Sequence, residues 1–284
     1  MDLPEPAHSF RVLVINPNTS THMTEALKPI LERLNYSDVC FKYFTAPNDT
    51  VTVQGRVCKP IASINSGEES AESALNCWSV LGLLDQYDAF LVACYSAHPL
   101  VGVLRQHIWD AQKTNPAFGK KYVTGIFEAS ITASLSLISA FDFVQPGQLQ
   151  KKQVDEAFGI VTTGSAWKEE LSKAVADMLN GAGHGSASRF AGVETTGLTA
   201  VQLHTTAWEE VRRRIIDATH RLLGNAPNFV GAICLGCAGM ADMEESVREG
   251  CIQAYGQIEG HRVKIIDGVV AGAGTLVTAC KAGF

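Results

Sequence analysis

The sequence predicts an α/β fold with two pseudo-symmetric lobes, each a four-stranded parallel sheet flanked by helices, and a functional site in the cleft between them. Three observations lead to this prediction. Short apolar runs alternate with segments of helical periodicity. Several of the runs are apolar on both faces. The second half of the chain also repeats landmarks of the first half.

The strands are expected in eight short runs rich in apolar and β-branched residues. These runs are 11–16, 39–46, 89–94, 122–128, 157–163, 188–194, 229–237 and 262–267. Apolar residues at helical spacing predict helices between them, most clearly at 20–34, 165–179 and 200–223. The run 89–94 has no polar face, which is typical of a parallel sheet covered by helices on both sides. The Gly- and Ser-rich segment 180–189 is expected to be a surface loop.

The repeat concerns three pairs of strand ends in the two halves. The pairs are Asn16 with Thr162, Cys94 with Cys237, and Glu128 with Asp267, and their members are 146, 143 and 139 positions apart. Three landmarks in the same order at nearly constant spacing indicate two copies of one four-stranded unit. Duplicated α/β lobes commonly bind a ligand in the crevice between them, at the carboxyl ends of the strands.

Composition excludes several classes of partner. The 284 residues are 46% apolar and 18% charged, with a net charge of −6 and a pI near 5.8. Such a chain has no basic field for nucleic acid or for an anionic membrane. Its first ten residues lack the features of a signal peptide, and the apolar stretches 228–241 and 269–280 are too short and Gly-rich to span a bilayer. We expect a cytoplasmic protein that forms a homo-oligomer.

The eight cysteines are scattered along the chain and are expected to be free thiols. Cys234 and Cys237 form a C-x-x-C pair, which can be a zinc half-site or a redox dithiol. A zinc site needs a second ligand pair, and no other C-x-x-C or H-x₃₋₅-H pattern accompanies this one. A redox dithiol usually begins a helix, whereas Cys234 falls inside the predicted strand. Cys234 is therefore interpreted as a core residue.

Cys94 and Cys237 remain as two buried structural thiols or as a chemical pair. Their equivalent positions favour the pair. Two acid/base groups on opposite faces of one carbon are what proton exchange with inversion requires, because one thiolate removes a proton and the other thiol returns one. Backbone N–H groups and a helix dipole in the following turns are expected to favour thiolate. The two thiols would titrate as a coupled pair.

Four motifs carry a resemblance to a known family. "INPNTS" (15–20), the strand end at Cys94, "GCAGM" (236–240) and "IIDGV" (265–269) resemble the Asp/Glu/hydantoin racemase superfamily, and most closely its hydantoin/allantoin racemase branch. The resemblance covers essentially the whole chain. It implies a two-cysteine racemase without cofactor or metal, acting at C5 of a cyclic ureide. Allantoin is the leading substrate, with a role in purine nitrogen catabolism.

The resemblance also implies lobe boundaries and separates branches of the superfamily. The first lobe would comprise 1–127 and 269–284, and the second 128–268. Amino-acid racemases carry "CNT" and "GCTH" at the two cysteines, whereas this chain has "CYS" and "GCAG". Hydantoin racemases tend to have "CFGDPG" where this chain has "CYSAHPL", so the reaction type follows more directly than the substrate. His98 in this stretch is interpreted as a cap residue or as a contact to the ligand.

Residues around the two cysteines are the candidate substrate-binding set. The loops 16–20 and 162–165 are expected to offer backbone N–H groups and hydroxyls to a developing enolate. Glu128 and Asp267 can instead be ordinary loop or cap residues. The full set is Asn16, Asn18, Ser20, Tyr95, Ser96, Glu128, Thr162, Thr163, Gly236, Ala238, Asp267 and Gly268.

Two other interpretations stay open at this point, and the first is a related reaction. The same scaffold supports maleate cis–trans isomerisation, arylmalonate decarboxylation and Asp or Glu racemisation. The decarboxylases keep only one of the two cysteines, so the presence of both Cys94 and Cys237 counts against that reaction. The second interpretation is a small-molecule binding protein in which neither cysteine has a chemical role.

Overall fold

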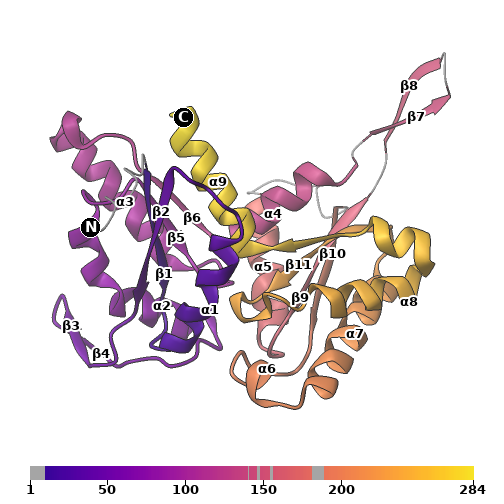
Figure 1. Ribbon diagram of the computed structural model, residues 1–284, viewed down its shortest axis with the longest axis horizontal. Coiled ribbons are helices and arrows are strands. Elements are labelled where there is room, and N and C mark those ends of the chain that lie inside the picture. The colour runs from indigo at the N-terminus through magenta and orange to yellow at the C-terminus, as the bar shows by residue number, and fades with distance from the viewer. Residues whose placement is uncertain (1–9, 140, 146–147, 154–155, 181–188) are drawn as a thin grey trace, which may run out of the picture. The chain divides into compact units, whose positions relative to one another are not determined.

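The computed structural model describes residues 10–139, 141–145, 148–153, 156–180 and 189–284 (Figure 1). The chain divides into two compact units. Unit 1 comprises Met1–Ala129 and Val269–Phe284, and unit 2 comprises Ser130–Gly268. The first junction lies two residues later than the sequence suggested. Most of the expected surface loop 180–189 falls outside the described residues.

Unit 1 is built on a four-stranded parallel sheet with the strand order β2-β1-β5-β6. These strands are β1 (Phe10–Asn16), β2 (Val39–Thr45), β5 (Ala89–Val92) and β6 (Tyr122–Gly125). The helices are α1 (Thr21–Glu32), α2 (Gly67–Asn76), α3 (Pro99–Thr114), the start of α4 (Ile126–Leu137) and α9 (Gly268–Ala282), with 3-10 turns η1 (Trp78–Leu83) and η2 (Pro116–Phe118). A hairpin of β3 (Val51–Val53) and β4 (Arg56–Cys58) completes the unit.

The sheet of unit 1 is covered on both faces, as its apolar strands predicted. Phe90 and Val92 of β5 pack into a cluster with Leu100 and Leu104 of α3. Leu91, between them, points to the other face, where α9 lies so close that an ideal Cβ on Gly272 would meet a Leu91 methyl carbon at 2.5 Å. Figure 1 shows α9, in yellow, beside the purple strands of this unit. The C-terminal helix is therefore part of the first fold unit.

Unit 2 has a second four-stranded parallel sheet, with the strand order β10-β9-β11-β12. Its strands are β9 (Ala157–Thr162), β10 (Phe190–Thr195), β11 (Val230–Gly236) and β12 (Lys264–Asp267). Its helices are the rest of α4, α5 (Trp167–Asn180), α6 (Gln202–Thr205), α7 (Trp208–Asn225), the 3-10 turn η4 (Ala238–Met240) and α8 (Glu244–Arg262), and the strands β7 (Phe141–Gln145) and β8 (Gln148–Gln153) form a hairpin.

The two main sheets have the same topology. In each, the first strand along the chain lies between the second and the third, and the fourth lies beyond the third. The prediction of an α/β fold with two four-stranded parallel sheets is confirmed.

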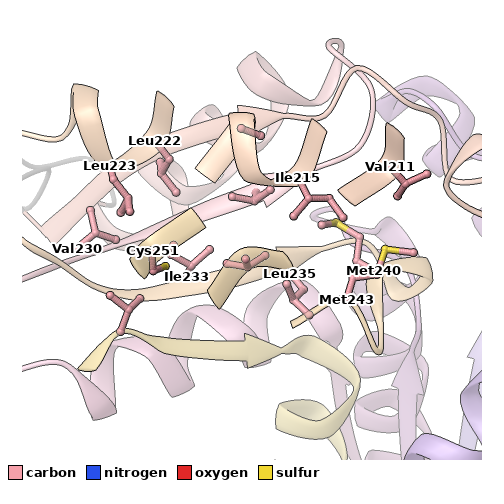
Figure 2. Close-up of a cluster of buried hydrophobic side chains, with 14 of the residues drawn as sticks. Val211, Ile215, Leu222, Leu223, Val230, Ile233, Leu235, Met240, Met243 and Cys251 are labelled. Carbon is pink, nitrogen blue, oxygen red and sulfur yellow. The ribbon is translucent and has the colours of Figure 1, made fainter. Parts of the chain in front are cut away.

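The core of unit 2 fills the space between its sheet and the helices α7 and α8 (Figure 2). Val211, Ile215 and Leu222 form an apolar stripe along α7. Ile233 and Leu235 of β11 pack against that stripe, whereas Cys234 points to the opposite face and contacts the Ser134 hydroxyl of α4 at 3.1 Å. Cys234 is fully buried, so its prediction as a core residue is confirmed.

Two predicted elements differ from the structure. The predicted helix 200–223 is two helices, α6 and α7, because Thr206 and Ala207 between them have extended ψ values. Consecutive threonines are weak helix formers, and Glu209 and Glu210 favour a new helix N-terminus at Trp208. The predicted strand 122–128 ends at Gly125, where α4 begins immediately.

Among the described residues, no helix combines the length and the apolar character that are needed to cross a bilayer.

Candidate functional site

Two of the three predicted landmark pairs lie at equivalent places in the two sheets. The third pair does not, because Asp267 ends β12 whereas Glu128 lies three residues beyond the end of β6, in α4. In unit 1, β1 ends at Asn16 beside β5, and Cys94 lies two residues beyond the end of β5. In unit 2, β9 ends at Thr162 beside β11, and Cys237 directly follows the end of β11. Because the strands are parallel, each cysteine lies with its neighbouring landmark at the carboxyl edge of its own sheet.

Cys94 is partly exposed in a short turn between β5 and α3. Its sulfur lies 3.6 Å from the hydroxyl of Ser96, which is itself only 5% exposed. A second thiol, Cys77, is close enough that a charge on Cys94 adds to the effect of burial and helps to raise the pKa of Cys77 to about 12. Cys94 is thus the accessible member of a small group of buried hydroxyl and thiol side chains.

Cys237 caps the turn η4. Its sulfur accepts a hydrogen bond from the backbone N–H of Gly239 at 3.3 Å. The expected backbone donors are therefore present, and those of Gly239 and Met240 lower the pKa of the thiol. Burial has the larger effect and raises that pKa to about 11. The expectation of a resting thiolate is wrong for Cys237, because desolvation outweighs the donors and keeps this group a thiol at neutral pH.

Thr162 holds Gly236, the residue before Cys237, in place. The Thr162 hydroxyl donates a hydrogen bond to the Gly236 carbonyl oxygen at 2.6 Å. An ideal Cβ on Gly236 would lie 2.5 Å from Thr162 Cβ, so only glycine fits at this close approach of β11 to β9. The Thr162 hydroxyl therefore donates its proton to a hydrogen bond within the protein. The contact gives Thr162 a positioning role, and its contact to a substrate stays a prediction.

The loop after β1 uses its polar groups to fix its own shape. The Asn16 amide donates to Asn18 Oδ1, to the Ser20 carbonyl oxygen and to Thr24 Oγ1, all within 3.1 Å. Asn16 is 2% exposed, and its Oδ1 accepts from the Asn18 N–H at 3.2 Å. Asn16 therefore stabilises the shape of the loop, and its contact to a ligand stays a prediction.

The backbone donors of this loop are likewise engaged. The Thr19 N–H donates to the Ile61 carbonyl oxygen at 2.9 Å, and the Ser20 N–H donates to Asn18 Oδ1 at 2.9 Å. The Ser20 hydroxyl caps α1 by accepting from the Met23 N–H. The N–H groups of residues 18–20 thus each have a partner in unit 1, and their predicted service to an enolate stays a prediction.

Glu128 lies in the first turn of α4, and its carboxylate folds back over the end of β6. An ideal Cβ on Gly125 would overlap Glu128 Oε2, so the glycine makes room for the carboxylate. Burial raises the pKa of Glu128, opposed by the backbone N–H groups of Glu128 and Gly125 and by the positive charge of Arg105. The acid predicted at this strand end is thus half-buried within unit 1.

The other predicted residues take the following places. Tyr95 is 5% exposed, and its ring packs edge-on against Phe127 with centroids 5.6 Å apart. The Thr163 carbonyl oxygen accepts from the Gly197 N–H at 3.0 Å. Ala238 begins η4, Asp267 ends β12 opposite Leu235, and Gly268 begins α9.

His98 is a helix cap, one of the two roles considered for it, and it is buried. Its Nδ1 accepts from the Leu100 N–H at 3.2 Å at the start of α3, so the proton of the neutral ring is on Nε2. Nε2 lies 2.9 Å from the Ser73 hydroxyl. Burial lowers the pKa of His98 to about 4, so the ring is neutral at physiological pH.

Sequence reasoning missed the serines of α2 that lie behind Cys94. Ser70 and Ser73 are at most 1% exposed, and Ser70 Oγ lies 3.3 Å from Ser96 Oγ. The signal was available in the sequence, because Ser66, Ser70 and Ser73 have the spacing of one helix face. Buried hydroxyls on that face indicate a polar cluster within the core.

His204 is a second residue that the sequence did not single out. An ideal Cβ on Gly239 would lie 3.1 Å from His204 Nε2 and 3.6 Å from the sulfur of Cys237. The break between α6 and α7 lets α6 pack on η4 and carry the imidazole to this position. The described part of the chain holds no group of three or more His, Cys, Asp or Glu residues arranged to bind a metal ion.

The sequence model of the family described as Asp/Glu/Hydantoin racemase matches residues 12–276. An uncharacterised protein of Schizosaccharomyces pombe is 32% identical over 274 residues, which cover 96% of this chain and 92% of the relative.

Two solved structures share the fold. An allantoin racemase from Pseudomonas fluorescens has a TM-score of 0.68 at 20% identity, over 96% of this chain and 92% of that one. An allantoin racemase from Klebsiella pneumoniae has a TM-score of 0.63 at 22% identity, over 97% and 89% of the two chains. At such identities the likeness shows the fold alone, whereas the family model spans nearly the whole chain. The chain belongs to the Asp/Glu/hydantoin racemase family.

Proposed function

We propose that this protein is a cofactor-independent racemase of 5-substituted hydantoins, with allantoin as the leading substrate. The observation that carries the proposal is the equivalence of Cys94 and Cys237. Each follows the third strand of a sheet, and the two sheets have the same strand order. Racemisation treats the two faces of a carbon alike, and a duplicated fold with one thiol per copy suits that requirement.

The proposed reaction moves one proton at a time. One cysteine, as thiolate, takes the proton from C5 of the ring, and the electron pair left on carbon delocalises into the adjacent carbonyl as an enolate. The other cysteine, as thiol, donates a proton to the opposite face of C5. The first is then a thiol and the second a thiolate, so the roles are set for the opposite enantiomer.

The environments of the two thiols suggest their resting states. Burial raises the pKa of Cys237 to about 11, so in this proposal Cys237 holds a proton and acts as the acid in the first turnover. When it has given up that proton, the N–H groups of Gly239 and Met240 stabilise the thiolate. Cys94 is then the base for the first enantiomer.

Racemisation and proton exchange test the proposal directly. Enantiopure allantoin and enantiopure 5-alkylhydantoins are incubated with the protein, optical rotation is followed, and loss of the C5 proton in D₂O is measured by NMR. We expect rotation to decay to zero with exchange at C5. A folded protein that racemises no member of this panel contradicts the proposal. Maleate is achiral, so a separate incubation with maleate is followed by the NMR signals of its vinylic protons, and the appearance of fumarate would indicate cis–trans isomerisation.

Matched cysteine variants assign the chemistry. Cys94→Ser and Cys237→Ser are each expected to lower kcat by about 10²-fold to 10⁴-fold, because each removes one acid/base group. Cys40→Ser changes a partly exposed thiol on β2 and is expected to retain activity. If both site variants bind the ligand and racemise it like the parent, the cysteines are silent and the two-thiol mechanism is wrong.

A further inference from the structure

Three hydroxyl or thiol groups behind the carboxyl edge of the unit 1 sheet form a continuous chain. Cys94 Sγ lies 3.6 Å from Ser96 Oγ, and Ser96 Oγ lies 3.3 Å from Ser70 Oγ. Ser70 Oγ donates to the carbonyl oxygen of Ser66 at 3.1 Å. Ser70 and Ser96 are 1% and 5% exposed, so the chain runs inward from the partly exposed thiol to the first turn of α2.

The far end of the chain fixes its direction when Cys94 is a thiol. Ser70 has one hydroxyl proton and gives it to the Ser66 carbonyl oxygen, so its oxygen is an acceptor toward Ser96. The Ser96 proton then points to Ser70, and the Ser96 oxygen accepts from the Cys94 S–H. Every donor in the chain has an acceptor.

The direction must change when Cys94 loses its proton. A thiolate has only acceptor capacity, so the Ser96 hydroxyl turns to donate to the sulfur. Ser70 can then keep its bond to Ser66 or donate to Ser96, but it cannot do both. The thiol state therefore has one hydrogen bond more in this chain than the thiolate state, and that bond depends on Ser70.

We propose that Ser96 and Ser70 are positioning residues that set the protonation balance of Cys94, with Ser96 favouring the thiolate and Ser70 favouring the thiol. No proton travels along the chain, because the proton taken from the substrate stays on the sulfur and only the Ser96 hydroxyl rotates. This inference deepens the proposed function and rests on it for its catalytic meaning, whereas the hydrogen-bond arrangement is independent of any substrate.

Two other titratable groups face this part of unit 1. Cys77, at the end of α2, is uncharged at neutral pH, because burial raises its pKa to about 12. His98, at the start of α3, is also uncharged, because burial lowers its pKa to about 4. His98 bonds to Ser73 and not to Ser70. Between pH 5 and 10 neither group supplies a charge that would replace the effect of the two serines.

The test measures the reactivity of Cys94 without substrate. The folded protein is treated with iodoacetamide from pH 5 to 11, and alkylation of the peptide containing Cys94 is quantified by mass spectrometry. Ser96→Ala removes the donor to the thiolate and is expected to raise the midpoint of the pH profile by about one pH unit. Ser70→Ala removes the acceptor that holds the Ser96 proton away from sulfur and is expected to lower the midpoint by about half a unit.

Two control variants separate this effect from a general disturbance. Ser73→Ala removes a buried hydroxyl of the same helix face that bonds to His98, and it is expected to leave the midpoint unchanged. Ser96→Thr keeps a hydroxyl and is expected to restore the parent profile. Shifts of the same sign in Ser96→Ala and Ser70→Ala, or no shift in either, overturn the inference.

The result is distinguishable from failure of the proposed function. Opposite shifts in a protein that racemises no hydantoin support the hydroxyl chain and reject the substrate class. If the protein does racemise hydantoins, the same variants are expected to move the pH profile of kcat/KM with the alkylation midpoint. A profile that stays fixed while the midpoint moves shows that Cys94 is not the base that limits the reaction, and overturns the catalytic meaning of the chain.

Discussion

The Thr162 hydroxyl donates to the Gly236 carbonyl oxygen at 2.6 Å, and Cys237 is the next residue along the chain. This bond joins the ends of β9 and β11 at the point where the second cysteine leaves the sheet. The peptide between Gly236 and Cys237 is therefore held by a side chain as well as by the strand ladder. The position of the thiol depends on a neighbouring strand.

Thr162→Val should test that dependence, because it keeps the shape of the side chain and removes the hydroxyl. We expect a loss of about 1–2 kcal/mol in the free energy of unfolding, from the unsatisfied carbonyl group. We also expect up to about a hundredfold loss in kcat, because the thiol is less well placed. Thermal or urea unfolding and racemisation kinetics measure the two effects.

Thr219→Val is the matched control for Thr162→Val. Thr219 is also fully buried in unit 2, and its hydroxyl donates to the Ile215 carbonyl oxygen within α7 at 2.9 Å. This variant is expected to lose no more stability than Thr162→Val and to keep its kcat. Equal losses of kcat in both variants would mean that Thr162 has no specific role at Cys237.

His98 should make stability depend on pH in the acid range. Burial lowers its pKa from 6.5 to about 4 in the folded state, so the unfolded chain binds a proton that the folded chain does not. The contribution of neutral His98 to the free energy of unfolding is present above pH 6.5 and is lost as pH falls through 4. The total loss is about 3 kcal/mol. His98→Asn keeps a capping side chain and should flatten the change in unfolding free energy between pH 6.5 and 4.

The exposed His261 of α8 supplies the control for His98, because His261→Asn removes an imidazole from the surface. Its acid profile should follow that of the parent. A parent profile that is already flat between pH 6.5 and 4 would contradict a neutral, buried His98.

Cys237 should make stability and reactivity depend on pH in the alkaline range. Burial raises its pKa from 9.0 to about 11, so its contribution to stability is present below pH 9 and is lost as pH rises through 11. Its alkylation by iodoacetamide should rise about tenfold per pH unit from pH 7 to 10, because only the thiolate reacts. A small-molecule thiol provides the reference, with its midpoint at about pH 8.5. A plateau for Cys237 below pH 9 would contradict the prediction.

Glu128→Gln should stabilise the protein increasingly as pH rises above 4.5. Burial raises the pKa of Glu128, so the contribution of its neutral form is present below 4.5 and is lost as pH rises through the folded value. Urea unfolding of parent and variant at several pH values gives the difference. Glu68→Gln is the control, because Glu68 also lies in the first turn of a helix but is exposed. If the difference in unfolding free energy between parent and variant is constant with pH, burial of the ionised Glu128 carboxylate does not destabilise the protein.

Strand placement was predictable mainly because the central strands of the two sheets are buried on two faces and stand out as apolar runs; these strands are β1, β5, β9 and β11. The run 89–94 shows why the existence of a strand was predicted correctly and why its end was not. Its apolar residues form β5 as predicted, but the strand ends at Val92, where the chain turns toward α3. The break at Thr206 and Ala207 was not predictable from periodicity, because Leu203 and Val211 continue an apolar pattern across it.

The candidate site was predictable to a different degree. The repeat placed Cys94 and Cys237 at the ends of corresponding strands, because the positions and order of strands can be predicted from the local sequence. The hydrogen-bond partners of Asn16 and Thr162 were not predictable. Thr24 becomes a neighbour of Asn16 only when the loop has folded, and Gly236 becomes a neighbour of Thr162 only when the strands have paired. The state of Cys237 was also misjudged, because its donors are local whereas its desolvation depends on everything packed around it.

The place of α9 has a consequence for the order in which the protein can form during its synthesis. Unit 2 is one continuous segment, Ser130–Gly268, whereas unit 1 includes Val269–Phe284. Leu91 stays uncovered until α9 has emerged from the ribosome. Until then Asp38 also lacks its ion-pair partner, the ammonium group of Lys281, which lies 2.9 Å from it in the folded protein. The segment made first is thus completed last, and β5, which leads to Cys94, must wait for a helix made after Cys237.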